Sequence, residues 1–510
     1  RDAGAEVDVA PAFDVPEFGI SRPVHVDRQL AGHAPGHGLF APLLELLAAQ
    51  FGRPLVATSG NVSGSPIVYE DQTAVARLGF IADRVLSHNR PILAPQDDSV
   101  LRLAGEMPVW IRRSRGIAPS LLVPGWQPPE TPILCAGADM KSAFCLNTGG
   151  QTYHSQYLGN LDHFDTQQQY LRLVRYFENI FQEQPALVVA DAHPGYVATN
   201  IAGQLAAEWK APLTHIQHHE AHFAAVLAEN QLLASDGILG IIWDGTGYGH
   251  DGQIWGGEFF RWDNHTIYSC GQMSYFPVLA GDKMAREPRL SAFSLANGHP
   301  DLDTNFEDKA LQIYRKMLEQ PAHLSTSSMG RIFDAVAALL GYCHINTFEG
   351  EAAMRLEQAA LGAKSCGWYD IPVEKGQPVS SQLLAHEVLQ DLAAGTSTAV
   401  IAFRFHRSLV EIIRKMALQE TVEKIAFSGG VFQNALLVQL CKQHLSSDFE
   451  LFFHRQLPPN DECIAFGQMV LAGLALRKVR SRAPEVGSRY LVPGKFMNTG
   501  YQVPGTRHQT

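Results

Sequence analysis

Two histidines four residues apart are the residues of this sequence best suited to holding a metal ion. His218 and His222 lie in the segment HHEAHFAAVLAEN, which has helical periodicity. In a helix this spacing places both imidazoles on one face, as a metal site requires. His215 and His219 form a competing pair at the same spacing, and a polar helix face with several solvated histidines is the alternative interpretation.

Two aspartates are the expected partners of a histidine pair. Asp244 follows the apolar stretch Ile238–Trp243 and opens the turn DGTGYG, where its carboxylate could face a cation while turn N–H groups face a phosphate. The alternative for Asp244 is an ordinary turn-forming aspartate. Asp461 follows the two prolines of LPPNDECIAFGQ, and taken alone it fits a helix N-cap better than a metal ligand.

A Gly-Gly turn in the segment FSGGVFQN, residues 427–434, is the next candidate site. The segment predicts a strand, a turn and the start of a helix. Gly429 and Gly430 would let the backbone approach a nucleotide closely, and the side chain of Asn434 could hydrogen-bond it. The sequence contains no GxxxxGK phosphate loop and no GxSxG nucleophile elbow, which argues against P-loop enzymes and α/β-hydrolases.

Two further polar segments could bind anions. Lys283 and Arg286, in AGDKMAREP, could hold an anionic substrate, and a solvated charged loop is the alternative. A polar turn and two arginines nearer the N-terminus could bind a nucleotide or lie on the surface; they are Ser59, Asn61, Ser63, Arg112 and Arg115.

An internal repeat predicts how these residues are positioned. Residues 132–157 contain three predicted strands separated by Gly-containing turns, and residues 238–262 repeat this plan with a turn at 244–249. A strand–loop–helix unit follows each copy, at 186–194 and at 424–430. Two copies of one α/β plan predict two lobes across a cleft, with backbone N–H groups that can hold phosphates. The helices expected between the second copy and its strand–loop–helix unit span residues 311–318, 331–340, 351–360, 381–393 and 401–418.

Composition restricts the class of protein. A chain of 510 residues is too long for one hydrophobic core, and its net charge of −11 argues against a general nucleic-acid binder. Seven cysteines without a CxxC pair fit reduced thiols, and no run of 18 apolar residues predicts a membrane span. We expect a cytoplasmic protein divided into residues 1–38 (unassigned), 39–121 (a small α/β domain), 122–131 (a Pro-rich linker), 132–476 (the two-lobed domain) and 477–510 (a basic, disordered tail).

A series of motifs gives the chain a resemblance to a known family. HHEAH, DGTGYG, GGEFF, AGDKMAREP, TSSMGRIFDAVAALLG, FEGEAAM, SGGVFQN and PPNDECIAFGQ resemble the HypF family, the carbamoyltransferases that mature nickel–iron hydrogenases. The resemblance runs from about residue 41 to residue 474. It implies an α/β protein in which a partial YrdC-like domain, residues 39–121, precedes a duplicated domain of the actin-like-ATPase and sugar-kinase type.

The resemblance also implies an activity. Enzymes of this family release carbamate from carbamoyl phosphate and activate it with ATP, which Mg²⁺ accompanies, as carbamoyl adenylate. They then pass the carbamoyl group to the C-terminal cysteine of a partner protein. The resulting thiocarboxamide is the precursor of the cyanide ligand of the hydrogenase iron.

Roles for individual residues follow from the resemblance. It implies an iron or zinc ion held by His218, His222, Asp244 and Asp461, which favours this set over His215 and His219. We expect Asp244, Lys283 and Arg286 to be catalytic. Nucleotide contacts are expected from Gly245, Thr246, Gly247, Asp334, Glu357, Gly429, Gly430 and Asn434 in the larger domain, and from Ser59, Asn61, Ser63, Arg112 and Arg115 in the YrdC-like domain.

The sequence departs from the family pattern in two respects. Complete members begin with an acylphosphatase domain and paired zinc-finger modules, so we expect an N-terminally truncated chain. Glu462 and Cys463 stand where the family commonly has two glycines. The alternatives are an O-carbamoyltransferase acting on a small molecule, an enzyme of the tRNA threonylcarbamoyl pathway, and an inactive fragment that binds nucleotide, or RNA through the YrdC-like domain.

Overall fold

A computed structural model describes residues 49–51, 59–62, 65–87, 89–121, 126–321, 324–363 and 367–482. The chain divides into two compact units, residues 1–56 and 57–510. Of the first unit only residues 49–51 are described, and they are helical. Ser63 and the tail from residue 483 lie outside the described residues. The predicted domain limits, at residues 39, 122, 132 and 477, stay predictions.

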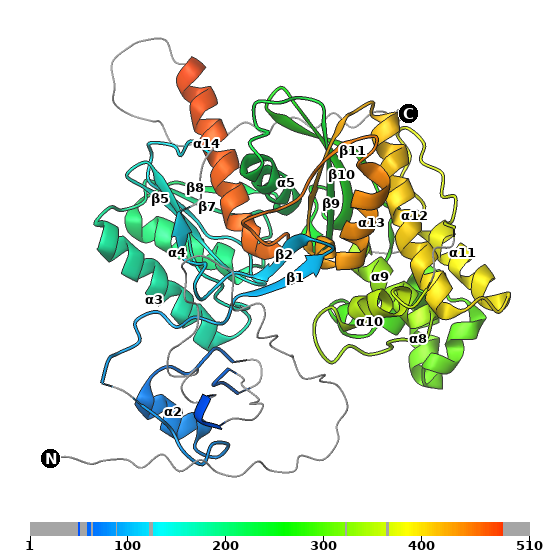
Figure 1. Ribbon diagram of the computed structural model, residues 1–510, viewed down its shortest axis with the longest axis horizontal. Coiled ribbons are helices and arrows are strands. Elements are labelled where there is room, and N and C mark those ends of the chain that lie inside the picture. The colour runs from blue at the N-terminus through cyan, green and yellow to red at the C-terminus, as the bar shows by residue number, and fades with distance from the viewer. Residues whose placement is uncertain are drawn as a thin grey trace. The chain divides into compact units, whose positions relative to one another are not determined.

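The first lobe is built on a six-stranded sheet. Its strands are β3 (Ser120–Leu121), β4 (Ile133–Cys135), β5 (Cys145–Thr148), β6 (Gln151–His154), β7 (Leu187–Asp191) and β8 (Leu213–Ile216), in the order β3-β6-β5-β4-β7-β8. Strands β4, β5 and β6 pair antiparallel, whereas β7 and β8 extend the sheet in parallel beside β4. Helices α3 (Phe164–Phe181) and α4 (Val197–Trp209) share a buried core with this sheet (Figure 1).

The second lobe repeats this plan in a seven-stranded sheet. Its strands are β9 (Ile238–Tyr248), β10 (Ile254–Asp263), β11 (Thr266–Gln272), β12 (Phe276–Pro277), β13 (Ser325–Thr326), β14 (Lys424–Ser428) and β15 (Glu450–Phe452). Strands β9, β10 and β11 pair antiparallel, and β14 and β15 extend the sheet in parallel beside β9. The order β11-β10-β9-β14-β15 thus corresponds to β6-β5-β4-β7-β8, which confirms the predicted duplication.

Strand β9 differs from its prediction, because it continues through the glycine-rich motif. Residues 244–249 were expected to turn, yet Gly247 pairs with Trp255 and Tyr248 with Ile254 on β10. The register of this pairing shifts at Gly256, which has φ of +157°, and the ladder continues from the pair of Gly257 with Trp243. The chain therefore reverses only after Tyr248, and Asp244 lies within a strand rather than at its end.

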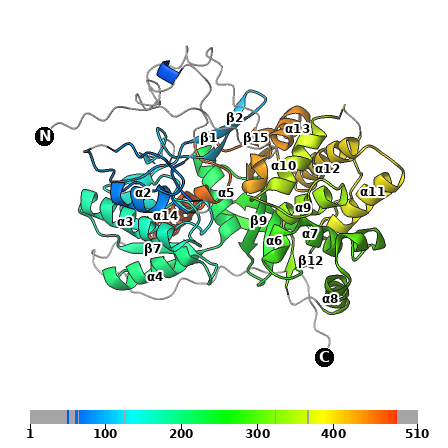
Figure 2. The same ribbon diagram turned by 90° about the horizontal axis from the view of Figure 1, so that it is seen from below.

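Two helices, α5 (His218–Glu229) and α14 (Ile464–Arg482), lie between the sheets (Figures 1 and 2). Helix α5 packs on β9 and β14 of the second lobe, α14 packs on β4 and β7 of the first, and the two helices pack on each other. A Cβ atom on Gly467 would lie 1.8 Å from the carbonyl oxygen of Ala221, so glycine is required where the helices meet. This contact connects the helix that bears His218 and His222 to both lobes.

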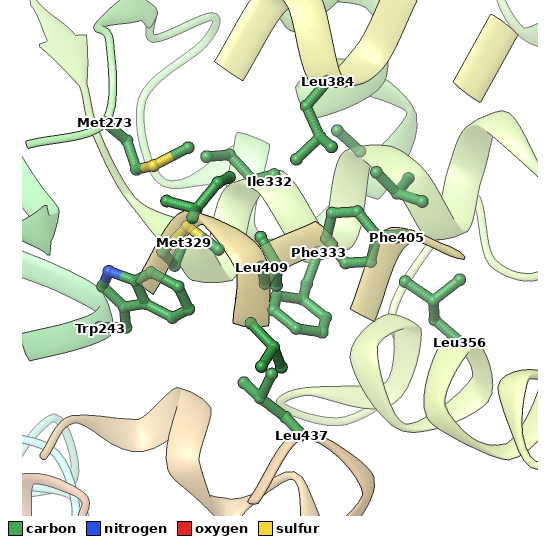
Figure 3. Close-up of a cluster of buried hydrophobic side chains, with 14 of the residues drawn as sticks. Trp243, Met273, Met329, Ile332, Phe333, Leu356, Leu384, Phe405, Leu409 and Leu437 are labelled. Carbon is green, nitrogen blue, oxygen red and sulfur yellow. The ribbon is translucent and has the colours of Figure 1, made fainter. Parts of the chain in front are cut away.

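A helical layer covers the other face of the second sheet. It consists of α6 (Lys283–Arg286), α7 (Pro288–Leu295), η2 (Pro300–Asn305), α8 (Asp308–Glu319), α9 (Met329–Leu339), α10 (Glu351–Ala360), α11 (Ser381–Ala393), α12 (Thr398–Gln419), η3 (Gly430–Gln433) and α13 (Ala435–Leu445). Figure 3 shows the buried cluster beneath it, with Trp243 of β9 at one end and Leu356 of α10 toward the other. All five predicted helices are present. Within the described ranges, no helix is long and apolar enough to cross a membrane.

The segment 59–121 is attached to the larger domain through its hairpin. Helix α2 (Asp71–Leu78) precedes strands β1 (Val100–Ala104) and β2 (Met107–Arg112), which pair antiparallel. Arg102 on β1 forms an ion pair with Glu357, and the indole N–H of Trp110 on β2 donates to the carbonyl of Arg455 at 3.1 Å. The side chain of Arg113 is buried, and its backbone N–H donates to Glu462 at 3.1 Å.

Helix α14 continues to Arg482, beyond residue 476, where the two-lobed domain was expected to end. The guanidinium of Arg477 donates to the carbonyl of Gln127 and lies 5.9 Å from the ring centroid of Trp126. The ammonium of Lys478 donates to the carbonyl of His265 at 2.9 Å. These contacts hold the basic end of the helix against the domain.

Glu258 on β10 is a buried acid in the core of the second lobe. Its Oε1 accepts a hydrogen bond from Ser327 at 2.5 Å, whereas Oε2 has no hydrogen-bond partner and lies 3.6 Å from Nε2 of His219. Burial raises the pKa of Glu258 to about 8. The folded protein therefore holds a proton that the unfolded chain releases near the ordinary glutamate pKa.

We predict that this proton makes the free energy of unfolding fall as pH rises toward 8. Over that range the folded state binds more protons than the unfolded state. The bound proton therefore stabilises the folded state at low pH, and this contribution is lost as the pH rises. Glu258→Gln keeps the shape and cannot ionise, so the variant should become the more stable protein above pH 8, by on the order of 1–3 kcal/mol. Melting temperatures at pH 5, 7 and 9 test this. Parallel pH profiles for the two proteins would contradict it.

Candidate metal and nucleotide site

Four side chains from three distant segments meet in one cluster. His218 and His222 lie on the first turns of α5, Asp244 on β9, and Asp461 at the start of η4 (Asp461–Cys463). One ligand atom of each residue lies within 4.8 Å of those of the other three. Both histidines are fully buried, and the side chain of Asp461 is 12% exposed. The helical spacing predicted to place both imidazoles on one face does so.

The histidine atoms that face the cluster have the chemistry of metal ligands. Nε2 of His218 lies 3.5 Å from Oδ2 of Asp244 and 3.8 Å from Oδ1 of Asp461, and Nε2 of His222 lies 3.7 Å from Oδ2 of Asp244. Neither Nε2 atom has a hydrogen-bond partner, although both are buried. Unpaired buried nitrogens are costly, and two imidazoles with two carboxylates are a donor set that suits a divalent cation.

Each lobe provides one side chain that contacts Nδ1 of one of the two histidines, the ring nitrogen that points away from the cluster. Nδ1 of His218 donates to Oδ2 of Asp191 at 2.8 Å, and Nδ1 of His222 lies 3.1 Å from Oγ of Ser428. Asp191 and Ser428 are the last residues of β7 and β14, the equivalent strands of the two lobes. Sequence reasoning missed both residues. The internal repeat could have found them, because it placed both strand ends at the same position of the two lobes.

The structure separates the alternatives that the sequence left open. His215 is exposed on β8, and His219 faces Glu258, so these two do not form a pair. The helix-cap role proposed for Asp461 belongs instead to Asn460, whose side chain accepts from the backbone N–H of Glu462. The carboxylate of Asp461 therefore faces the cluster.

Burial and charge perturb every group of the cluster. Burial lowers the pKa of His222 to about 4 and, together with the charge of Asp244, raises that of Asp461 to about 7. Burial alone would lower the pKa of His218 and raise that of Asp244. At His218 the charge of Asp191 and its hydrogen bond outweigh burial, so the pKa of His218 is well above its usual range. At Asp244 the facing imidazole of His218, with that of His222, outweighs burial and holds the pKa well below its usual range. Asp244 is thus the permanent anion of the cluster.

The glycines next to the cluster have distinct structural roles. The N–H of Gly430 donates to Oδ1 of Asp244 at 2.8 Å and so orients the carboxylate. Gly429 has φ of +104°, and a Cβ there would lie 2.1 Å from the carbonyl oxygen of Trp243. A Cβ on Gly247 would lie 2.2 Å from the ring of His219. Gly245 alone has open space beside it, which leaves room for a ligand to approach the backbone.

The N-terminus of α9 lies beside Gly245. Its cap is Ser328, whose hydroxyl oxygen accepts from the N–H of Arg331 and whose O–H points at the carbonyl of Gly245. A Cβ on Gly330 would lie 2.9 Å from Cα of Gly245. Thr246, the next candidate on β9, is exposed. A helix N-terminus beside an accessible glycine strand can hold a phosphate.

Three other residues that were predicted to contact the nucleotide form hydrogen bonds or ion pairs with groups of the protein instead. The side chain of Asn434 caps α13 by accepting from Leu437 N–H, and its amide group lies 3.0 Å from Nε2 of His406. Glu357 accepts from Arg102 and from the N–H of Leu436. Asp334 is buried beside Arg331, 3.0 Å from its guanidinium. These contacts give all three residues a structural role.

Lys283 and Arg286 are not part of the cluster. Both are exposed on the short helix α6. The ammonium of Lys283 contacts Tyr314 Oη at 3.0 Å and Glu287 at 3.3 Å. The structure therefore does not bring them to the four candidate ligands.

Three of the five predicted contacts in the YrdC-like segment line one pocket. Ser59, Asn61 and Arg112 border a cavity of about 260 Å³, which Tyr157 and Asn160 of the first lobe also line. Arg112 lies 3.5 Å from Asp97 and over the ring of Tyr157. Arg115 is not among the lining residues and lies 3.6 Å from the carboxylate of Asp98.

Family models match three parts of the chain. The model described as "Carbamoyltransferase, Kae1-like Domain, second subdomain" matches residues 240–468, and the "HypF Kae1-like domain" model matches residues 128–229. The Sua5–YciO–YrdC model, described as "Telomere recombination", matches residues 37–114. These matches confirm the predicted fold class, a YrdC-like segment followed by a duplicated two-lobed domain.

Individual relatives cover most of the chain. It is 34% identical over 461 residues to the carbamoyltransferase HypF of Synechocystis and 36% identical over 453 residues to that of Rhodobacter capsulatus. These alignments cover 84% and 86% of this chain but 58% and 59% of the relatives. A solved full-length HypF, in its phosphate- and nucleotide-bound form, superposes with a TM-score of 0.79 at 31% identity, over 86% of this chain and 70% of that one. The HypF of T. kodakarensis gives a TM-score of 0.76 at 31% identity, over 82% of this chain and 57% of that one. The chain therefore belongs to the HypF carbamoyltransferase family.

Proposed function

We propose that this chain carries the carbamoyl-transfer centre of a hydrogenase-maturation enzyme. The whole reaction would start from carbamoyl phosphate and proceed with ATP through carbamoyl adenylate to the C-terminal cysteine of a partner protein, yielding a cyanide-ligand precursor. The observation that carries the proposal is the four-residue cluster, with two unpartnered imidazole nitrogens, beside the open backbone of Gly245. The chain spans about three-fifths of the length of the curated relatives it matches, so the complete activity is itself part of the proposal.

In this proposal His218, His222, Asp244 and Asp461 hold a divalent iron or zinc ion. Two carboxylates and two neutral imidazoles would leave the loaded site formally uncharged, which suits a buried position. Such an ion, when bound, supplies a Lewis acid for the carbonyl oxygen of the transferred group. The chain's own contribution is orientation: Asp191 and Ser428 hold the imidazoles, and the N–H of Gly430 holds Asp244.

Carbamate is a poor electrophile, and adenylation gives it a leaving group that a thiol can displace. We propose that the backbone of Gly245, Thr246 and Gly247 and the N-terminus of α9 hold the adenylate phosphate, with Mg²⁺ accompanying ATP. Gly429, Gly430, Asn434, Asp334 and Glu357 would shape this side of the cleft. Lys283 and Arg286, being exposed, would act only on an incoming anionic substrate or partner.

The pocket lined by Ser59, Asn61 and Arg112 is the proposed nucleotide site of the YrdC-like segment. Tyr157 and Asn160 of the first lobe also line it. A site shared by the segment and the first lobe would keep an adenylate that hydrolyses easily away from bulk water.

We predict that the metal-loaded protein contains about one divalent ion per chain and that His222→Ala loses it. The substitution removes one of the two imidazole ligands, whereas His215→Ala, on exposed β8, removes the histidine that competed with it in the sequence. Elemental analysis after dialysis measures the ion content of each protein. Equal metal in wild type, His222→Ala and His215→Ala would contradict the proposed centre.

We also predict that the chain transfers the carbamoyl group from synthetic carbamoyl adenylate to a peptide that ends in cysteine. Mass spectrometry of the peptide should show one added carbamoyl group. Asp244→Ala should lower the rate by at least about 100-fold, since it removes the permanent anion of the cluster. Asp236→Ala, in the exposed loop before β9, is the matched control and should keep the wild-type rate. The absence of transfer by the metal-loaded wild type would contradict the proposed activity.

A further inference from the structure

A buried chain of hydrogen bonds leads from His222 to the other end of α5. Nδ1 of His222 lies 3.1 Å from Oγ of Ser428, which lies 2.8 Å from Nε2 of His454. Nδ1 of His454 in turn lies 2.7 Å from Oε2 of Glu229, in the last turn of α5. The side chains of His454 and Glu229 are 2% and 4% exposed, so water does not supply these partners.

The carboxylate of Glu229 determines which group donates in each hydrogen bond of this series. It can only accept, so Nδ1 of His454 carries the hydrogen, and in the neutral form of the ring Nε2 accepts from the hydroxyl of Ser428. The oxygen of that hydroxyl then accepts from Nδ1–H of His222. The lone pair of His222 is thereby left on Nε2, which faces Asp244 and has no other partner. The thiol of Cys463, 3.3 Å from the same Nδ1, is a weaker partner than a hydroxyl.

Glu229 also anchors the loop that leads to Asp461. Its Oε1 accepts from three consecutive backbone N–H groups, those of Arg455, Gln456 and Leu457. The neighbouring Asn230 donates to the carbonyl of Phe453 at 3.0 Å. Two prolines, Pro458 and Pro459, then carry the chain stiffly from this anchor to Asn460 and Asp461. The position of Asp461 therefore depends on the end of the helix that bears both histidines.

We infer that Glu229 is a positioning residue of the metal centre, acting through His454 and Ser428 on the tautomer of His222 and through the 455–457 backbone on the placement of Asp461. One carboxylate at the far end of α5 thus positions two of the four ligands. One of these lies on the same helix, and the other lies more than 200 residues away in the sequence. The inference rests on the proposed function, because it takes His222 and Asp461 to be ligands of a divalent ion.

Glu229→Gln tests this with the smallest change of shape. A glutamine must turn its NH₂ group either toward His454 or toward the three backbone N–H groups. In the first case His454 must accept on Nδ1, every donor in the chain reverses, and His222 carries its hydrogen on Nε2, where it blocks the ligand. In the second case the loop to Asp461 loses its acceptor. Glu220→Gln is the matched control, since Glu220 lies on the same helix and faces a different histidine, His250.

The measurement is the affinity of the metal-free full chain for Zn²⁺, by competition with a chromophoric chelator. We expect Glu229→Gln to raise the dissociation constant by about 10- to 100-fold, as for other groups that orient metal ligands, and Glu220→Gln to leave it within about twofold. Ser428→Ala should also weaken Zn²⁺ binding while keeping the loop anchor intact. Long-range proton–nitrogen NMR of ¹⁵N-histidine-labelled metal-free protein should place the hydrogen of His222 on Nδ1 in the wild type.

Wild-type Zn²⁺ affinity in Glu229→Gln, or an Nε2–H tautomer of His222 in the wild type, would overturn the inference. If Glu229→Gln does not fold, as judged by its melting temperature, Ser428→Ala decides. Weaker binding at an unchanged melting temperature supports the inference, and wild-type binding overturns it. A failure of the proposed function looks different, because Zn²⁺ would then bind wild type and His222→Ala equally well, or neither.

Discussion

Asp244 and Asp461 place two carboxylates in one buried space, and much of the surrounding structure compensates for this. Two like charges removed from water repel each other and lose their hydration, which a folded chain tolerates only with counter-charges and hydrogen bonds. Asp244 obtains both, a hydrogen bond from the N–H of Gly430 and a counter-charge from His218, and stays ionised. Asp461 obtains less compensation for its burial, and its pKa rises to about 7. A divalent cation would satisfy both carboxylates and both unpartnered imidazole nitrogens.

The duplicated architecture explains how residues so distant in sequence meet. Equivalent strands β7 and β14 end at Asp191 and Ser428, and each holds one of the histidines of the helix between the lobes. That helix is fixed by the close contact of Ala221 with Gly467 of α14, the helix that follows Asp461. Another contact joins the two lobes directly, where the ammonium of Lys141 in the first lobe pairs with Glu349 in the second. A change in how the lobes sit would therefore alter the distances between the ligands.

Local patterns in the sequence predicted much of this, and long-range contacts account for what they missed. The spacing of His218 and His222 defines one helix face, and the limits of α10 and α11 follow from periodicity and flanking residues. The glycines of β9 were predicted to form a turn. They form a strand because they pair with β10, a contact that the local sequence does not reveal. Asn460, not Asp461, caps η4, which only the local geometry decides. Glu229 and His454 are 225 residues apart, and no periodicity relates them.

The most direct test of the central claim is anomalous X-ray diffraction from crystals grown with Zn²⁺. We expect one strong zinc peak among the four side chains, about 2.0–2.2 Å from Nε2 of His218, from Nε2 of His222 and from a carboxylate oxygen each of Asp244 and Asp461. Nδ1 of each histidine should still point away from the ion, toward Asp191 and Ser428. A zinc peak at other residues, with this cluster empty at saturating Zn²⁺, would contradict the account.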